Sequence, residues 1–291
     1  MEHGALVRKL RTERKMSQVQ LASGISSRTT LSSFENDHSR ISSDILFKYL
    51  ERLNVTVQEY YFYLNDSVTP EKEYLAAYYY NEITKKRDIE IAQRIRDFRS
   101  KYADSNDFYF CCMSIELKLF LNKRNARNVY DVDEDKRIIK DYLNRVQQWG
   151  HFEISLFSNC LDIFNSGYIR RTFSTLLKRT KLLSSIAAYQ NDISIFLNNC
   201  IVLSFERKQF MDAHYYVNQL AKMSEDSPRK AYDRLMYQYY LELLKALSGQ
   251  NGHPNKISEQ FRNLGFSDHA DELSLLGVQI LGSATEVDEL N

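Results

Sequence analysis

The stretch SQVQLASGISSRTTLSSFE, residues 17–35, decides the fold of the N-terminal part of this chain, because it combines two helix starts with one helix stop. Ser17 can cap a helix through its side-chain oxygen, and Gln20 can bond back to the amide of Ser17 to complete a capping box. Gly24 can adopt the left-handed conformation that ends this helix. The stretch therefore predicts a short helix from Ser17, followed by a tight turn.

A second short helix follows the turn. Either Ser26 or Ser27 can cap it, and Leu31 and Phe34 then fall on one side at helical spacing. The other side carries small polar residues and one arginine, namely Ser27, Arg28, Thr29, Thr30 and Ser33. Two helices joined in this way predict a helix-turn-helix whose second helix suits the DNA major groove.

The flanking residues predict three more helices, which makes a five-helix domain over residues 1–65. A first helix precedes the stretch, Ser42 or Ser43 caps a fourth, and Thr56 with Glu59 forms a capping box for a fifth. The first helix carries a basic cluster of Arg8, Lys9, Arg11, Arg14 and Lys15. This cluster either forms a solvated charged face or contacts DNA phosphates.

Composition limits the class of protein. Only 9 glycines and 3 prolines occur among 291 residues, of which 43% are hydrophobic, so an all-α protein with an ample core is expected. The net charge of +1 requires any DNA-binding basic surface to be local. No leader is recognisable and no apolar run reaches the roughly 18 residues of a membrane span, so we expect a cytoplasmic protein without membrane contact.

Residues 70–284 predict a second domain built from helices. Pro70 suits the first position of a helix, which places a linker at residues 66–69 and leaves residues 285–291 as a tail. Short polar breaks between amphipathic segments predict antiparallel neighbouring helices. The expected helices cover residues 70–86, 88–102, 106–123, 134–149, 151–166, 170–187, 190–205, 209–223, 228–248, 256–264 and 267–281.

A weak internal repeat lies within this second domain. Phe-Ser-Asn-Cys-Leu at residues 157–161 aligns with Leu-Asn-Asn-Cys-Ile at residues 197–201, and each is followed by a second helix. A helix pair every 35 to 40 residues or so is the period of tetratricopeptide-like solenoids. Stacked pairs of this kind form a curved array with a concave binding face.

The N-terminal domain resembles the lambda-repressor-like helix-turn-helix of the Cro/repressor superfamily over residues 4–64. The family pattern is met by Leu10, Arg11, Arg14, Ser17, Gln18, Leu21, Ala22, Leu31, Ser32 and Glu35. The resemblance implies that Arg11 and Glu35 form a structural pair and that Gln18 contacts a DNA phosphate. It departs from the family at Asp37, where the family favours glycine.

The whole chain resembles the Rgg family of Gram-positive transcription regulators, because a Cro-type domain precedes a long helical-repeat region. The resemblance implies that the repeat domain binds a short peptide pheromone inside the cell and forms a homodimer. The expected partners are therefore double-stranded operator DNA, a short hydrophobic signalling peptide and a second copy of the chain.

For DNA, we expect Arg28, Thr29 and Thr30 to face base edges, with Ser27 and Ser33 nearby. Arginine can bind guanine through two hydrogen bonds, although a contact with phosphate alone is the alternative for Arg28. The residues expected to hold the DNA backbone are Gln18, Arg14 and Lys15, together with Arg8; Arg40 and Lys48 are weaker candidates.

For the peptide, Asn159 and Asn199 are the candidates, because a carboxamide can meet both the N–H and C=O groups of an extended ligand. Their equivalent places in the repeat favour this role; the alternative is that they only cap or pair within the solenoid. Tyr189 is a third candidate for the same groove. Cys160 and Cys200, which follow the asparagines, are expected to be core thiols.

No catalytic or cofactor motif is recognisable. The chain has no P-loop, GxGxxG or HExxH motif, and the acidic run from Asp131 lacks the glycine and the glutamate of a calcium loop. We therefore expect a regulator without metal or cofactor, not an enzyme. The alternative function is a helical-repeat adaptor or inhibitor that binds a protein partner and uses the DNA module for tethering.

Overall fold

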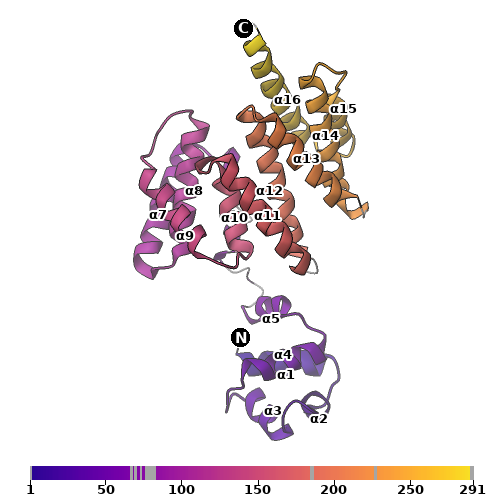
Figure 1. The fold of residues 1–291 in the computed structure, drawn as a ribbon. Helices are drawn as coiled ribbons and strands as arrows, with labels where there is room; N and C mark the ends of the chain where they lie inside the picture. The colour runs from indigo at the N-terminus through magenta and orange to yellow at the C-terminus, as the bar shows by residue number, and fades with distance from the viewer. Residues whose placement is uncertain are drawn as a thin grey trace. The chain divides into compact units, whose positions relative to one another are not determined.

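The chain divides into two compact units, residues 1–87 and 88–291. The computed structural model describes residues 2–65, 68, 71–72, 74–75, 83–183, 187–225 and 228–288 (Figure 1). Within these ranges every regular element is a helix, as the sequence predicts. None of the helices in the described part of the chain is both long and apolar enough to cross a membrane.

The first unit contains the predicted helix-turn-helix. Its helices are α1 (His3–Glu13), α2 (Gln18–Ala22), α3 (Arg28–Glu35), α4 (Ser43–Leu53) and α5 (Val57–Leu64), followed by the 3-10 helix η1 (Ile83–Lys85). The predicted capping boxes are present at Ser17 and at Thr56. Ser27 rather than Ser26 caps α3, and Ser42 rather than Ser43 caps α4.

The turns before and after α3 both contain a residue with left-handed backbone. Gly24, which ends α2, has a φ of 68°, and Asp37, which follows α3, has a φ of 62°. Aspartate tolerates this conformation less readily than glycine, yet the turn after α3 still forms. Leu31 and Phe34 are buried in a small core beneath α3, so the opposite side of that helix faces solvent.

The second unit is a series of paired helices. They are α7 (Asp88–Ser105), α8 (Phe108–Arg124), α9 (Asp133–Arg145), α10 (His151–Asn159), α11 (Ser166–Leu183), α12 (Ala187–Glu206), α13 (Phe210–Ser224), α14 (Ala231–Leu247), α15 (Pro254–Asn263) and α16 (Ser267–Asp288). Two 3-10 turns, η2 (Leu161–Ile163) and η3 (Pro228–Lys230), interrupt the series.

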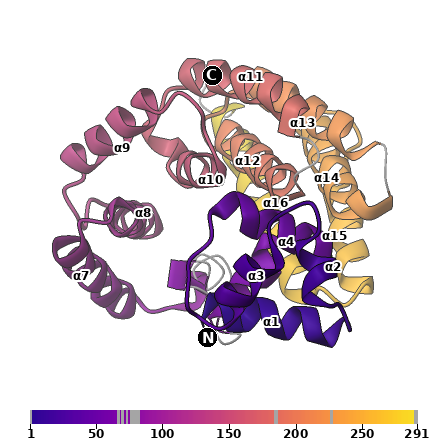
Figure 2. The same cartoon turned by 90° about the horizontal axis from the view of Figure 1, so that it is seen from below.

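The paired helices form two layers. Figure 2 shows α8, α10 and α12 on the inside of an arc, with α7, α9 and α11 on its outside. One apolar core runs through the stack from Cys112 on α8, through Phe157 on α10 and Phe196 on α12, to Tyr239 on α14. The predicted helical-repeat architecture is confirmed, and we call the surface of α8, α10 and α12 that is turned away from the outer helices the inner face.

Several predicted helix boundaries need correction, and the helix expected over residues 134–149, for example, ends at Arg145. The helix expected over residues 151–166 ends at Asn159 and is followed by η2, and Asn165 caps the next helix by accepting the amide of Tyr168 at 2.8 Å. This cap also starts α11 at Ser166 rather than at residue 170. The last helix extends to Asp288 rather than ending at residue 281. Most of the expected linker and of the helix over 70–86 lies outside the described residues.

Candidate functional site

A buried ion pair fixes the recognition helix α3 against α1. The Nε and Nη2 atoms of Arg11 donate to the two carboxylate oxygens of Glu35 at 2.7 and 2.8 Å, and its Nη1 donates to the carbonyl of Met16 at 2.6 Å. The side chains of Arg11 and Glu35 are only 10% and 1% exposed. A bidentate ion pair of this kind fixes the orientation of the two helices as well as the distance between them. It therefore holds α3 in place from its buried side.

Gln18 belongs to the same network. Its Nε2 donates to Glu35 Oε2 at 2.8 Å, which leaves the carboxamide oxygen and one N–H for other partners. Burial by itself raises the pKa of Glu35, but hydrogen bonds from Arg11 and Gln18, together with the positive charge of Arg11, lower it overall. The phosphate contact expected of Gln18 would therefore share its side chain with a structural role.

Arg52 on α4 is a positioning residue that the sequence patterns did not reveal. Its Nη1 donates to the carbonyls of Gln20 and Leu21 at 3.3 and 3.0 Å, and also to the carbonyl of Ser23. These carbonyls lie at the end of α2, where backbone acceptors lack helical partners. Since Arg52 is about thirty residues away along the chain, only the folded unit brings it to this helix end.

The exposed start of α3 carries the predicted base-reading residues. Ser27 Oγ accepts the amide of Thr30 at 3.0 Å and lies 2.7 Å from Thr29 Oγ1, so the hydroxyls form one local cluster. Arg28 is exposed, and no residue within the described part of the chain forms a hydrogen bond or ion pair with its guanidinium group. Ser33 lies one turn further along and is half-buried. Arg28 is thus the side chain here best able to reach a base edge.

Basic residues of α1 and of the turn that follows it lie on the surface of this unit, and Arg8 lies beside the end of α3. Arg8 donates to Asn36 Oδ1 at 3.3 Å, while Arg14 donates to the carbonyl of Leu10 at 3.1 Å. Lys15 is exposed and has a φ of 52° in the turn after α1. These side chains leave positive charge on the surface of the unit, as phosphate contacts require.

The two candidate asparagines lie on successive inner helices. Asn159 Nδ2 on α10 donates to Glu116 Oε2 on α8 at 2.9 Å. Asn199 Nδ2 on α12 donates to Ser158 Oγ on α10 at 3.0 Å. Within the described ranges neither carboxamide oxygen accepts a hydrogen bond, so each asparagine combines a structural contact with a free acceptor.

The accessibility pattern of α12 places Asn199 on the inner face. Ile195, Asn199, Val202 and Glu206 are spaced three or four residues apart and are all at least partly accessible. Residues with this spacing share one side of a helix. Asn159 is exposed at the end of α10. A chain lying across the inner helices would therefore meet both carboxamides.

Tyr189 does not lie beside Asn199. It is half-buried at the start of α12, about three helical turns away, and its hydroxyl would be 3.5 Å from a side chain placed at Gly150. His151 forms a hydrogen bond with Asp192 at 2.7 Å in the same region. Tyr189 could contact only a different part of a ligand from the two asparagines.

Polar contacts join the inner helices at two further places. Lys123 on α8 reaches Asp162 in η2 at 3.3 Å and Glu206 on α12 at 2.9 Å, so it bridges past the end of α10. Asn198, the neighbour of the candidate Asn199, accepts a hydrogen bond from Tyr240 on α14 at 3.0 Å. These contacts link neighbouring helices of the repeat unit.

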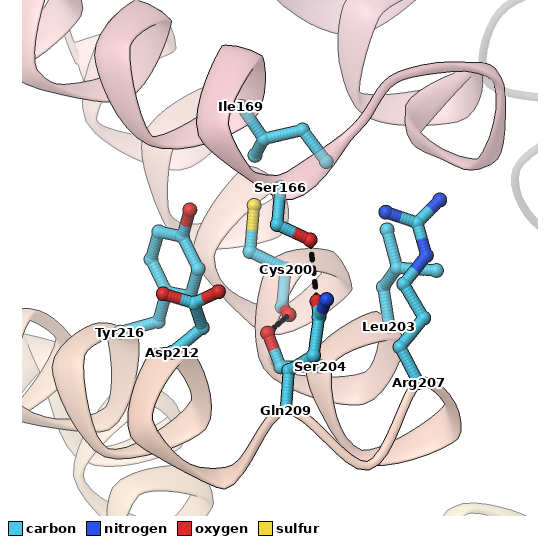
Figure 3. A pocket seen from close by; sticks show the side chains of 9 residues that line it. All are labelled: Ser166, Ile169, Cys200, Leu203, Ser204, Arg207, Gln209, Asp212 and Tyr216. Carbon is cyan, nitrogen blue, oxygen red and sulfur yellow. Dashed lines mark hydrogen bonds between the residues drawn. The ribbon is translucent and has the colours of Figure 1, made fainter.

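A small cavity between α11, α12 and α13 is too small for a peptide. Its volume is about 10 Å³, which is the space of roughly one water molecule. Figure 3 shows Cys200 and Ser204 among its lining residues, with Ser166 bonded to Gln209 across it.

The cysteines form part of the core. Cys160 and Cys200 are buried free thiols, as expected, while Cys112 is also buried and Cys111 is half-buried. Burial raises the pKa of the Cys160 and Cys200 thiols well above the ordinary value, which disfavours the reactive thiolate. Among the residues that the structure describes, no three His, Cys, Asp or Glu side chains gather in a way that could hold a metal ion.

Known proteins resemble both units. The model of the C-terminal domain of the HTH-type transcriptional regulator Rgg matches residues 72–274, and a helix-turn-helix model matches residues 7–60. A solved structure of a candidate transcriptional regulator from Listeria monocytogenes EGD-e is 18% identical and has a TM-score of 0.81, with 97% of this chain and 98% of that chain covered.

Two other solved structures share the fold. The SHP pheromone receptor Rgg2 of Streptococcus dysgalactiae is 21% identical with a TM-score of 0.71, with 95% of this chain and 98% of that chain covered. The PrgX/iCF10 complex gives 18% identity and a TM-score of 0.66, with 97% of each chain covered. Because the Rgg model matches more than half of the sequence and a helix-turn-helix precedes it, this chain belongs to the Rgg family of helix-turn-helix transcriptional regulators.

Proposed function

We propose that this regulator binds double-stranded operator DNA through α3 and that a short hydrophobic signalling peptide, held on the inner face, controls this binding in the cytoplasm. The observation that carries the DNA-binding role is the exposed, unpaired Arg28 on a helix that Arg11 and Glu35 hold from behind. Family membership favours this function over the adaptor that the sequence also allowed.

The base-reading role of Arg28 can be tested by substitution. Arg28→Ala should lower discrimination between operator and unrelated DNA by about 1 to 3 kcal/mol, because the two hydrogen bonds to guanine are lost. Operator fragments would first be selected from genomic DNA with the unaltered protein, and both proteins would then be compared by fluorescence anisotropy.

Lys15→Ala is the matched control for Arg28→Ala. Loss of a phosphate contact should weaken all DNA nearly equally and reduce the salt dependence of binding. If Arg28→Ala behaves in the same way, Arg28 contacts only phosphate, which was the alternative.

Two kinds of support favour a peptide ligand. Asn159 and Asn199 lie on successive inner helices and keep a free carboxamide oxygen each, which suits the N–H groups of an extended backbone. Among the structural neighbours, Rgg2 is described as a pheromone receptor and PrgX as a complex with iCF10. Tyr189 would contact a separate part of the ligand.

The peptide role predicts a specific loss of binding. Asn159→Ala or Asn199→Ala should weaken peptide binding by roughly tenfold, because each removes about one hydrogen bond to the ligand backbone. A pool of synthetic hydrophobic octapeptides supplies the ligands, and calorimetry measures the affinity of those that the unaltered protein retains. Asn263→Ala, at the end of α15 and away from the inner face, is the control and should bind normally; equal binding by all variants would contradict the assignment.

We also propose a homodimer that pairs two DNA-binding units. Two half-sites roughly one helical turn apart multiply the few contacts that one small unit makes. A peptide can then change DNA binding by stabilising one dimer arrangement more than another. Removal of residues 1–65 should abolish DNA binding but preserve the dimer; a monomeric remainder in analytical ultracentrifugation would contradict this division of roles.

A further inference from the structure

Glu116 on α8 is an acid of the inner face without a positive partner. It is half-buried, and its only hydrogen bond within the described residues is the one that Asn159 donates at 2.9 Å. No lysine, arginine or histidine among those residues lies within ion-pair distance of it. Asn159 neutralises no charge, so the carboxylate is hydrogen-bonded but not compensated.

The surroundings of Glu116 raise the free-energy cost of a carboxylate without a counter-charge. The buried thiols of Cys112 and Cys160 lie near it, and burial raises the pKa of Glu116 to about 7, against the opposing effect of the hydrogen bond from Asn159. Lys123 is seven residues further along α8, roughly 10 Å at the rise of a helix, and it already binds Asp162 and Glu206. A carboxylate that is removed from water without a counter-charge is unfavourable.

Two other half-buried acids of the same unit are compensated, whereas Glu153 resembles Glu116 in having, within the described residues, only hydrogen-bond donors, Tyr142 and the amide of Gly150. Asp135 forms an ion pair with Lys118 at 2.5 Å, and Asp212 forms one with Arg170 at 2.9 Å. Glu116 differs because it lies at the junction of α8 and α10, on the same side of the helix as Lys123 and next to a proposed ligand contact. A ligand whose backbone reaches Asn159 passes directly beside this carboxylate.

We propose that Glu116 binds a positively charged group of the peptide, either its N-terminal ammonium or a lysine or arginine side chain. This inference rests on the proposed peptide-binding function and narrows the class of ligand to a hydrophobic peptide with one cation at the α8–α10 junction. Glu116 would then supply specificity, while the asparagines hold the backbone. A cation placed against a desolvated carboxylate gains more than one in open water.

Four pools of synthetic octapeptides with amidated C-termini test this proposal. All are built from Ala, Gly, Val, Ile, Leu and Phe; one has free N-termini, one is acetylated, one is acetylated with a single Lys, and one is acetylated with a single Glu. Retention on the immobilised full-length protein is measured by mass spectrometry. The free-amine or the lysine pool should be retained at least about tenfold more than the neutral acetylated pool, and which of the two is retained identifies the source of the charge.

Glu116→Gln should remove this preference while it still retains neutral peptides. The substitution preserves shape, and its carboxamide oxygen can still accept the hydrogen bond from Asn159, so the fold should persist; Glu116→Asp, which preserves the charge, should retain part of the preference. Glu259→Gln is the matched control, because Glu259 on α15 lies outside the inner face and is already paired with Arg262 at 3.2 Å. It should leave the preference for cationic pools intact.

Two results would overturn the inference, and they are distinguishable. Equal retention of cationic and neutral pools by the unaltered protein, or an unchanged preference in Glu116→Gln, contradicts the role of Glu116 but leaves the peptide site in place. Failure to retain any pool contradicts the proposed peptide function itself, and the inference with it.

Discussion

Glu35→Ala should cause the DNA-binding unit to open locally while the repeat unit stays folded. The substitution leaves the guanidinium of Arg11 buried without its counter-charge, which costs about 3 to 5 kcal/mol, a large part of the stability of a small domain. Hydrogen–deuterium exchange of the full chain should show loss of protection in α1 and α3, with α12 unchanged.

Matched variants separate the ion pair from its packing. Replacing both partners by apolar residues, as in Arg11→Met with Glu35→Leu, should recover much of the lost protection, because no buried charge remains. Asp97→Ala on α7 removes an exposed pair with Arg94 at 3.8 Å and should have little effect. Unchanged protection of α3 in Glu35→Ala would show that the pair contributes nothing to the position of α3.

Low pH should reproduce part of the loss of exchange protection that we expect in Glu35→Ala. The pKa of Glu35 in the folded protein is below its ordinary value, so its stabilising contribution is complete above the unfolded pKa of about 4.3. The contribution is lost as the pH falls through the lowered pKa. Protection of α3 should therefore decrease on acidification in the unaltered protein, and this component should be absent from Glu35→Ala.

Gly252→Ala should destabilise the C-terminal part of the repeat unit. A methyl group there would lie 2.2 Å from the carbonyl oxygen of Glu242 and 2.5 Å from the amide nitrogen of Ala246, both backbone atoms of α14. The loop would have to move away from the helix, which also breaks the bond from the amide of His253 to Glu242 at 2.8 Å. Overpacking of this kind costs about 1 to 3 kcal/mol.

Thermal unfolding and exchange at α14 and α15 measure the effect of Gly252→Ala. Gly167→Ala is the matched control, because its added methyl group would meet only side-chain atoms, at 3.5 Å or more, within helix α11. That control should be neutral or slightly stabilising, since alanine is the better helix former. Equal stability of Gly252→Ala and the unaltered protein would mean that the loop can move freely.

The local structure of the N-terminal unit followed from its sequence. The capping boxes at Ser17 and Thr56 depend on residues three positions apart, so the sequence alone specifies where α2 and α5 begin. One local signal was missed. Asn165 caps α11 by accepting the amide of Tyr168, three residues further on, whereas the prediction continued a single helix through residues 151–166.

The candidate sites were only partly predictable. The internal repeat placed Asn159 and Asn199 on corresponding helices. Helical periodicity in the first domain indicated that Arg28 is exposed. The periodicity of one helix does not reveal which residue of the next helix it meets, so the contact of Asn159 with Glu116, 43 residues away, was not foreseeable.

By itself, the sequence determined the all-helical class, the helix-turn-helix and the repeating helix pairs, because capping, turn formation and amphipathic spacing act over a few neighbouring residues. Only the tertiary structure decided that Arg52 caps α2, that Gly252 must lack a side chain and that Glu116 has no counter-charge among the described residues. Each of these depends on groups brought together by packing from distant parts of the chain, where burial sets both the available space and the cost of an unpaired charge.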